Sequence, residues 1–164
     1  MADDVSALIK DLAGADAGKR AAAAERLAQL GPDAAAAAVP LVEACRADDD
    51  GLRESVVAAL EELGPPPAAA IARLTVLVGD ENPLAGYWAA TLLGRSGEAA
   101  ADAVAALAAC VGSEADASVR QRAAWALGQI GPSAASARAV LEKAAGDADP
   151  RLARLAAEAL AAIG

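Results

Sequence analysis

The side chains best suited to binding a partner are three aromatic residues, because the chain is otherwise poor in aromatic groups. The sequence contains one Tyr, two Trp and no Phe. These residues are Tyr87, Trp88 and Trp125, and Arg95 and Arg122 lie close to them along the chain. Trp, Tyr and Arg are enriched where protein surfaces bind most strongly, partly through cation–π attraction. The five residues are therefore the first candidates for a binding surface.

Catalytic and metal-binding chemistry has few candidate residues. The sequence has no histidine, which excludes Ser/His/Asp and Cys/His catalysis. Residues 14–20, GADAGKR, resemble a phosphate-binding loop but are one residue short between the glycines and lack Ser or Thr after the lysine. The acidic segment 48–61 has Arg53 and Ala59 where a calcium-binding EF-hand loop requires Gly and Glu. We therefore expect no enzyme activity, no cofactor and no metal site.

A predicted helix from Asp116 to Gly131 positions Arg122 and Trp125. Asp116 is a suitable N-cap residue, and Gly131 followed by Pro132 is typical of a helix end. Apolar residues recur along one stripe of this helix, at Val119, Ala123, Leu127 and Ile130. Arg122 and Trp125 fall off that stripe, on positions that should face away from the core.

The same helix pattern occurs five times along the chain. The closing glycines are Gly31, Gly64, Gly97, Gly131 and Gly164. The N-cap residues are Asp16, Asp49, Asn82, Asp116 and Asp149. An earlier helix in each copy is centred on Leu8, Leu41, Leu74, Leu107 and Leu141. A period of this length indicates a stacked helical array. We predict one all-α domain over residues 1–164, with two-helix repeats at about 1–31, 32–64, 65–97, 98–131 and 132–164; Pro40 should bend or shorten the first helix of the second repeat.

The repeat resembles a known family at specific residues. Val119-Arg120, Ala126-Leu127 and Ile130-Gly131-Pro132 are similar to the pattern of HEAT repeats, in particular those of the phycobilisome-lyase type. The resemblance implies an α-solenoid, an α-α superhelix whose second helices line a concave surface. The family's arginine near the start of the second helix appears as Arg20, Arg53 and Arg120. It is replaced by Gly86 and Ala153 in the third and fifth repeats, which interrupts any continuous ladder of Asp and Arg.

The two cysteines are expected to be buried free thiols. Cys45 and Cys110 lie on the first helices of repeats that are two apart. Stacked helices pack at roughly 8–10 Å, so the two thiols should be separated by about 20 Å. A disulfide requires Cα atoms within about 7 Å. We therefore predict no disulfide.

Charge and aromatic residues together suggest the kind of partner. The formal net charge is −9 and the sequence pI is about 4.4, which argues against nucleic acid. Glu54 and Glu61 lie on the exposed face of the second repeat, so we predict a protein or peptide partner, with a basic one suited to this charge. An alternative for Trp88 is that it fills a groove between helices instead of contacting a partner. The predicted concave surface comprises Trp88, Trp125, Tyr87, Arg122, Arg95, Glu54 and Glu61.

The first functional hypothesis is a non-enzymatic protein-binding scaffold. A second, from the resemblance, is a subunit similar to the bilin lyases and isomerases that binds a tetrapyrrole, and a third is a purely structural repeat array. We see no signal peptide or membrane-spanning segment and expect a cytoplasmic protein. The chain stops on the closing signal of its fifth repeat. It is expected to be a monomer whose last helix serves as a cap, a fragment of a longer array, or an end-to-end dimer.

Overall fold

The computed structural model describes residues 4–164, which contain α-helices and short 3₁₀ helices and, within that range, no strand. The chain divides into two compact units, unit 1 (Met1–Ala70) and unit 2 (Ile71–Gly164). The all-α prediction is confirmed. The repeat boundaries predicted from the glycines fall between successive helix pairs, whereas the organisation as a single domain stays a prediction.

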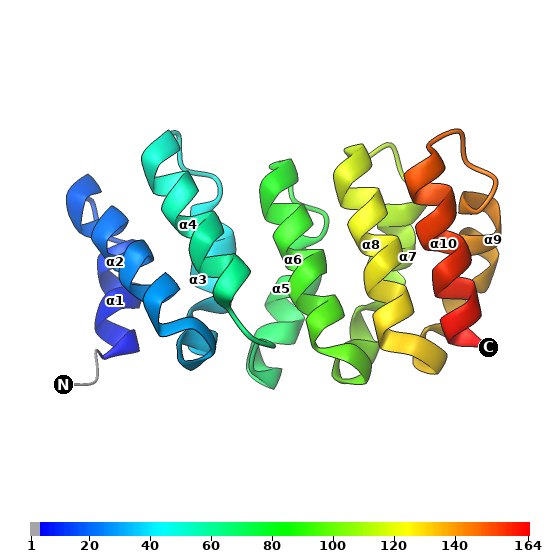
Figure 1. Ribbon diagram of the computed structural model, residues 1–164, viewed down its shortest axis with the longest axis horizontal. Coiled ribbons are helices and arrows are strands. Elements are labelled where there is room, and N and C mark those ends of the chain that lie inside the picture. Colours follow the sequence, from blue (N-terminus) through cyan, green and yellow to red (C-terminus); the bar gives the residue numbers. More distant parts are fainter. Residues whose placement is uncertain (1–3) are drawn as a thin grey trace. The chain divides into compact units, whose positions relative to one another are not determined.

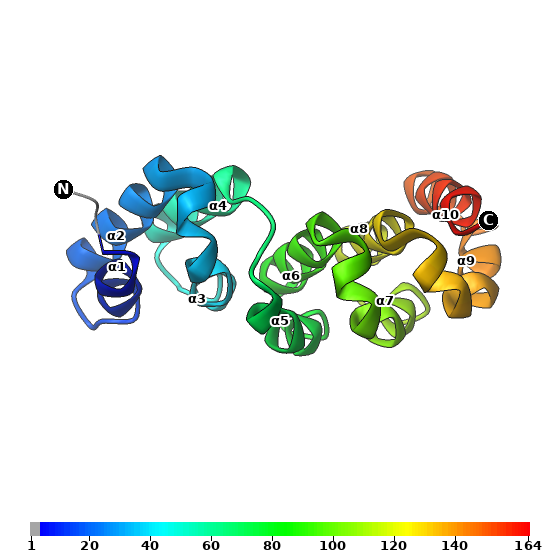
Figure 2. The ribbon, with the colours of Figure 1, turned by 90° about the horizontal axis from the view of Figure 1, so that it is seen from below.

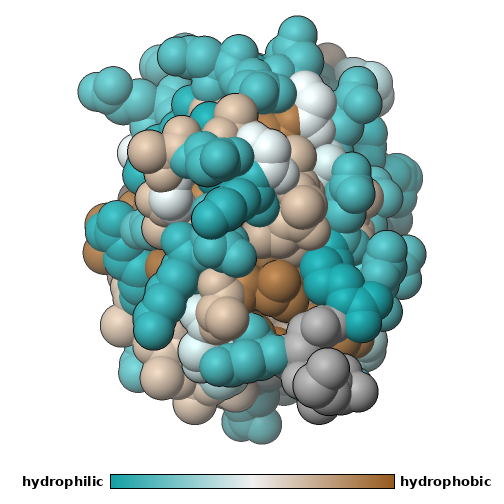
Figure 3. Space-filling view, turned by 90° about the vertical axis from the view of Figure 1, so that its left-hand side faces the viewer, coloured by the Kyte–Doolittle hydropathy of each residue, from teal (hydrophilic) through white to brown (hydrophobic). Residues whose placement is uncertain are grey.

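Unit 1 consists of two helix pairs. Its elements are α1 (Val5–Leu12), α2 (Ala17–Leu30), the 3₁₀ helix η1 (Gly31–Ala37), α3 (Ala38–Ala44), α4 (Asp50–Glu62) and η2 (Ala68–Ala70). Helix α2 packs against α1 and α4, and Leu27, Leu41 and Leu60 are fully buried (Figure 1). Viewed on the side of α1 and α2, the surface shows small apolar areas interrupted by hydrophilic side chains (Figure 3).

Unit 2 contains three helix pairs in two layers. Its elements are α5 (Ile71–Leu77), α6 (Pro83–Arg95), η3 (Gly97–Ala103), α7 (Val104–Val111), α8 (Ala117–Ile130), η4 (Gly131–Ala137), α9 (Arg138–Ala144) and α10 (Pro150–Ile163). One layer is formed by α6, α8 and α10, which lie side by side, and the other by α5, α7 and α9 (Figures 1 and 2). The face of α6, α8 and α10 that points away from the other layer is called the second-helix face below.

The helix starts follow the sequence prediction. All five predicted N-cap side chains accept hydrogen bonds from backbone N–H groups in the first turns of their helices. The Asp49 carboxylate, for example, accepts from Leu52 N at 2.9 Å. Such bonds satisfy donors that have no partner within the helix. The N-caps therefore set where α2, α4, α6, α8 and α10 begin.

The helix ends follow the prediction except in the second repeat. Gly31, Gly97 and Gly131 have φ angles of 53°, 55° and 72°, as the pattern of closing glycines predicts. Gly64 does not have a positive φ, because α4 ends at Glu62 and the next residue, Leu63, is already extended (φ −66°, ψ 132°). Three prolines follow, and a residue before proline is driven away from the helical region. The boundary between the two units follows this proline segment, after Ala70.

Pro40 was predicted to bend or shorten the first helix of the second repeat. The helix is short, but Pro40 is not the reason. The first helix of the second repeat is short, since η1 occupies residues 31–37 and α3 only 38–44. The fifth repeat has the same arrangement of η4 and α9 without a proline at the matching position. Pro40 lies in the first turn of α3, where a missing N–H group leaves no intrahelical hydrogen bond unmade.

The predicted apolar stripe of α8 and the predicted burial of both cysteines are confirmed. Val119, Ala123, Leu127 and Ile130 are all buried, so the stripe on α8 faces the interior of unit 2. Cys45 and Cys110 are both buried, and neither forms a disulfide. Burial raises the pKa of the Cys110 thiol, and the positive charge of Arg120 partly opposes that shift.

Candidate binding surface on unit 2

The centre of the second-helix face is a cluster of Tyr87, Arg122 and Trp125. The carbon at the centre of the Arg122 guanidinium lies 4.6 Å from the Tyr87 ring centroid and 4.9 Å from that of Trp125. Arg122 also donates a hydrogen bond to the Tyr87 hydroxyl. These contacts join α6 to α8, because Tyr87 lies on α6 and the other two residues lie one turn apart on α8. The guanidinium is therefore held between two ring faces.

Trp125 is half-buried because its ring lies directly on Gly94 of α6. A Cβ atom at position 94 would lie 2.3 Å from Cζ3 of the Trp125 ring and 2.9 Å from Cε3. Only glycine leaves room for the ring at this distance. One face of the Trp125 ring therefore packs on the backbone at Gly94, and the remainder of the ring stays accessible.

Two small cavities lie beside Trp125 along α8 and α10. The larger, about 200 Å³, is lined by Tyr87, Ser118, Gln121, Arg122, Trp125, Arg151 and Leu155. The smaller, about 70 Å³, is lined by Trp125, Gly128, Gln129, Leu155, Glu158, Ala159 and Ala162. We call the two cavities together the Trp125 groove. Its positions come from three consecutive repeats.

The charge of the Trp125 groove differs from that of the whole chain. Arg122 and Arg151 line its larger cavity, and neither forms an ion pair within residues 4–164. No carboxylate lines that cavity. The faces of Tyr87 and Trp125 already carry a guanidinium, so a partner's Lys or Arg would meet a cation there. The local chemistry suits a carboxylate, whereas the sequence predicted a basic partner.

Trp88 is packed between helices, which is the alternative that the sequence analysis gave for this residue. Its side chain is buried, with 6% exposed, and it meets the Tyr87 ring edge-on at a centroid distance of 5.5 Å. The Arg95 guanidinium lies 5.8 Å from the centroid of the Trp88 ring. The Trp88 indole N–H is buried without a hydrogen-bond partner in the described part of the chain. Trp88 is therefore a packed residue, and its assignment to a contact surface was wrong.

Glu54 and Glu61 are exposed on α4 in unit 1. The aromatic cluster is on α6 and α8 in unit 2. The structure thus assigns the predicted acidic and aromatic residues to different compact units. A basic partner for the face of α4 stays a prediction of its own, independent of the Trp125 groove.

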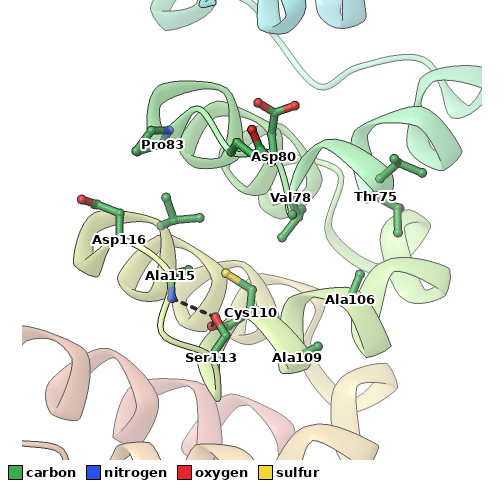
Figure 4. Close-up of a pocket in the computed structure, with 14 residues that line it drawn as sticks. Thr75, Val78, Asp80, Pro83, Ala106, Ala109, Cys110, Ser113, Ala115 and Asp116 are labelled. Carbon is green, nitrogen blue, oxygen red and sulfur yellow. Dashed lines mark hydrogen bonds between the residues drawn. The ribbon is translucent and has the colours of Figure 1, made fainter.

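Sequence reasoning missed a larger cavity on the opposite side of unit 2. This cavity, about 600 Å³, lies among α5, α7 and the starts of α6 and α8. Figure 4 shows Pro83 and Asp116 at one end, Thr75 and Ala106 at the other, and Val78 and Cys110 between them. The signal for it in the sequence is Gly86, which interrupts the arginine pattern. The structure adds Val76, which lines the cavity and is 64% exposed on α5.

Comparison with known proteins identifies the family. The HEAT-repeat profile matches residues 38–127 and 113–164, and the chain belongs to the HEAT-repeat family. The α-solenoid class predicted from the sequence is thereby confirmed. No curated protein matches the chain.

Solved structures show the same fold at low sequence identity. The complex of CpcE and CpcF of phycocyanin lyase from Nostoc sp. PCC7120 is 21% identical, with a TM-score of 0.70, over 98% of this chain and 65% of that one. An engineered protein is 24% identical, with a TM-score of 0.66, over 97% of this chain and 47% of that one. The present chain thus spans about half to two thirds of the length of these two structures. A structure in a study of microtubule plus end tracking by XMAP215, CLIP-170 and EB1 is 20% identical, with a TM-score of 0.61, over 94% of this chain and 72% of that one. At these identities the likeness concerns the fold alone.

The described residues contain neither a metal-binding cluster nor a membrane-spanning helix. Among residues 4–164, no group of three or more His, Cys, Asp or Glu side chains is arranged to hold a metal ion. In the same range, no helix has the length and apolar character needed to cross a membrane.

Proposed function

We propose that the chain is a non-enzymatic scaffold that binds a protein or peptide segment in the Trp125 groove. The observation that carries the proposal is the half-buried Trp125 ring next to Arg122 and Arg151, two arginines without carboxylate partners in residues 4–164. Tryptophan and arginine are among the residue types that carry most of the binding energy in protein interfaces. The proposal concerns unit 2 and does not depend on unit 1.

The preferred segment carries a carboxylate next to an apolar side chain. A carboxylate takes two parallel hydrogen bonds from a guanidinium, and this geometry is the strongest form of such a pair. The apolar side chain would pack on the exposed part of Trp125 and on Leu155. Arg122 is already held by Tyr87 and Trp125, so little of its conformational freedom is left to lose on binding.

Site-specific photocrosslinking tests where the partner binds. Gln129 is exposed and lines the smaller cavity of the groove, whereas Ala72 is exposed on α5 in the opposite layer. A benzophenone amino acid at position 129 should crosslink a partner that the same group at position 72 does not. Equal crosslinking from both positions would count against the groove.

Affinity measurements with the crosslinked partner then test the chemistry. Arg122→Gln combined with Arg151→Gln should weaken binding by about tenfold or more, since truncating a charged contact in an interface commonly has an effect of that size. Arg73→Gln, at an exposed position of α5, is the matched control and should leave the affinity unchanged. An unchanged affinity in the double variant, with the helical circular dichroism spectrum intact, would refute the proposal.

A tetrapyrrole is the second candidate ligand. A flat ring system bearing carboxylates would use the same arginine pair and the same ring surface of Trp125. The fold similarity to the CpcE and CpcF complex of phycocyanin lyase is the reason to include it. Titration with a free bilin, followed through tryptophan fluorescence, separates the candidates: saturable quenching that disappears in Arg122→Gln/Arg151→Gln favours the tetrapyrrole, and its absence favours the peptide.

A further inference from the structure

The 600 Å³ cavity has a smaller counterpart in the next repeat of unit 2. The leucine and N-cap positions align Val78, Gly79 and Ala109 of the large cavity with Val111, Gly112 and Lys143. Those three residues line a cavity of about 260 Å³. The same kind of inter-repeat cleft therefore occurs twice, with very different volumes.

An arginine side chain occupies part of the smaller cleft. Arg120 lies in the smaller cleft, where its Nε–H donates to the Val111 carbonyl oxygen at 3.0 Å. Its Nη2 forms an ion pair with Asp147 at 2.9 Å. Gly86 is the residue at the matching position of the larger cleft. The third repeat thus lacks the side chain that occupies this space in the fourth.

The missing arginine leaves an acceptor unused. The Val78 carbonyl oxygen corresponds to that of Val111 and lies 3.2 Å from where a Cβ of residue 86 would be. No hydrogen-bond donor within residues 4–164 reaches it. The Val78 carbonyl oxygen can therefore accept a hydrogen bond from a ligand N–H group. Such a group would take the place that the Arg120 guanidinium has in the fourth repeat.

The remaining walls are apolar and the charged groups are all acidic. Val76, Ala106 and Ala109 contribute apolar surface, and Asp80, Glu81 and Asp116 are the charged residues that line the cavity. No Lys or Arg among the described residues lines it. The nearby Arg120, whose charge reaches Cys110, is paired with Asp147. A volume of about 600 Å³ falls within the range of small-molecule sites.

We propose that this cavity binds a small hydrophobic ligand that carries a positively charged amine or guanidinium group. The cationic group donates to the Val78 carbonyl oxygen and is attracted by the acidic side chains, as the Arg120 side chain does in the adjacent cleft. The apolar body of the ligand fills the space along Val76, Ala106 and Ala109. This site lies among α5, α7 and the starts of α6 and α8, shares no lining residue with the Trp125 groove, and is independent of the function proposed for that groove.

Dansylcadaverine is a suitable probe, because it joins an apolar fluorescent ring system to a primary amine. We expect saturable binding that is about fivefold tighter than that of neutral dansyl amide, which is the size of effect that exposed charge pairs produce. Anionic dansylglycine should bind more weakly than both. Equal binding of the amine and the neutral amide, or no binding of dansylcadaverine at millimolar concentration, would overturn the proposal.

Substitutions that fill the cavity locate the binding site. Gly86→Arg introduces the side chain that the first, second and fourth repeats carry at this position. It should weaken dansylcadaverine binding by about tenfold or more, since the pocket is then occupied. Gly86→Ala adds the same Cβ, 3.1 Å from Cγ1 of Val119, but leaves the cavity open and should retain binding. If Gly86→Arg does not fold, Ala109→Lys at an exposed wall position provides the second test, with Ala105→Lys on the same helix as its control. Unchanged binding in the filling variants would overturn the assignment.

Cys110 reports directly on occupancy. It lines the cavity and is 7% exposed, whereas Cys45 is fully buried and lines none of the cavities described here. Dansylcadaverine should slow alkylation of Cys110 by N-ethylmaleimide, measured by mass spectrometry, while the rate at Cys45 stays constant. Saturable probe binding without protection of Cys110 would place the ligand elsewhere and refute the proposal.

Discussion

The contact between Trp125 and Gly94 yields a prediction in which the sign of a mutational effect depends on the background. Gly94→Ala places a Cβ atom 2.3 Å from the Trp125 ring, so the ring must move off α6. Forcing extra volume into a packed position costs about 1–3 kcal/mol. Replacing glycine by alanine inside a helix returns about 1 kcal/mol through helix propensity. The net expectation is a destabilisation of about 1 kcal/mol in the otherwise native chain.

Removing the ring reverses the expected sign. In a Trp125→Ala background the new methyl group meets no ring, and only the helix propensity remains. Gly94→Ala should then stabilise unit 2 by about 1 kcal/mol, which gives a coupling energy of about 2 kcal/mol between the two positions. Gly51→Ala serves as a control, because its Cβ would lie at an ordinary 3.4 Å from the Asp49 carboxylate. Gly51 is in unit 1, so circular dichroism measures this variant, and its effect should be the same in either background.

Thermal unfolding provides the assay. Both tryptophans are in unit 2, so fluorescence follows that unit, and Trp88 still reports when Trp125 is absent. A change of 1 kcal/mol in a domain of this size corresponds to about 4–8 °C in Tm. Circular dichroism should give the same ordering of the variants. Stabilisation of equal size by Gly94→Ala in both backgrounds would refute the packing of Trp125 on Gly94.

Three further predictions concern individual contacts. Tyr87→Phe should destabilise the native chain by about 0.5–1 kcal/mol by removing the acceptor for Arg122, but should have no effect after Arg122→Gln; equal losses in both backgrounds would contradict the contact. Asn82→Ala should cost about 1 kcal/mol, because the Asn82 side chain caps α6 through the backbone N–H groups of Leu84 and Ala85, and Asn82→Asp should preserve the cap; chemical denaturation measures both. The pKa of Asp147 is lowered by hydrogen bonds from the backbone N–H of Asp149 and from the Arg120 side chain. The ionised carboxylate therefore stabilises the fold at pH values above its ordinary pKa near 4. This stabilisation is lost as the pH falls below that value, toward the lowered pKa of the folded state. Asp147→Asn should accordingly flatten the acid limb of stability against pH, and an unaltered limb would show that Asp147 does not contribute.

The fold was predictable because each repeat carries its boundaries in local chemistry. Asp116 caps α8 through a single side chain, and Gly131 ends it through a backbone conformation that glycine adopts without strain. Gly64 shows the limit of such patterns, because the same residue type in front of three prolines has a different conformation. The conformation of a residue can therefore be predicted from the sequence of one repeat when it depends only on neighbouring residues in the chain.

The candidate site was predictable only in part, because it depends on distances between repeats. Positions along α6 separate Trp88 from the apolar stripe, but they do not show that its ring is buried while Trp125 stays half-exposed. The charge of the groove also depends on Arg151, which belongs to the next repeat and which the spacing within one repeat does not place beside Trp125. The pairing of Arg122 with Tyr87 likewise joins two helices whose spacing no single repeat encodes.

Helix α6 shows how departures from a repeat create local surfaces. Its interior contains Gly86 and Gly94, each of which lowers helix propensity by about 1 kcal/mol relative to alanine. At both positions a Cβ would press on a side chain of α8, on Val119 in one case and on Trp125 in the other. The two glycines therefore let α8 approach α6 closely at two points, one beside the 600 Å³ cavity and the other beneath the Trp125 groove. Gly86→Ala should therefore lower the stability of unit 2 while leaving both the cavity and the Trp125 groove in place. Gly94→Ala should disturb the groove while leaving the cavity open to dansylcadaverine.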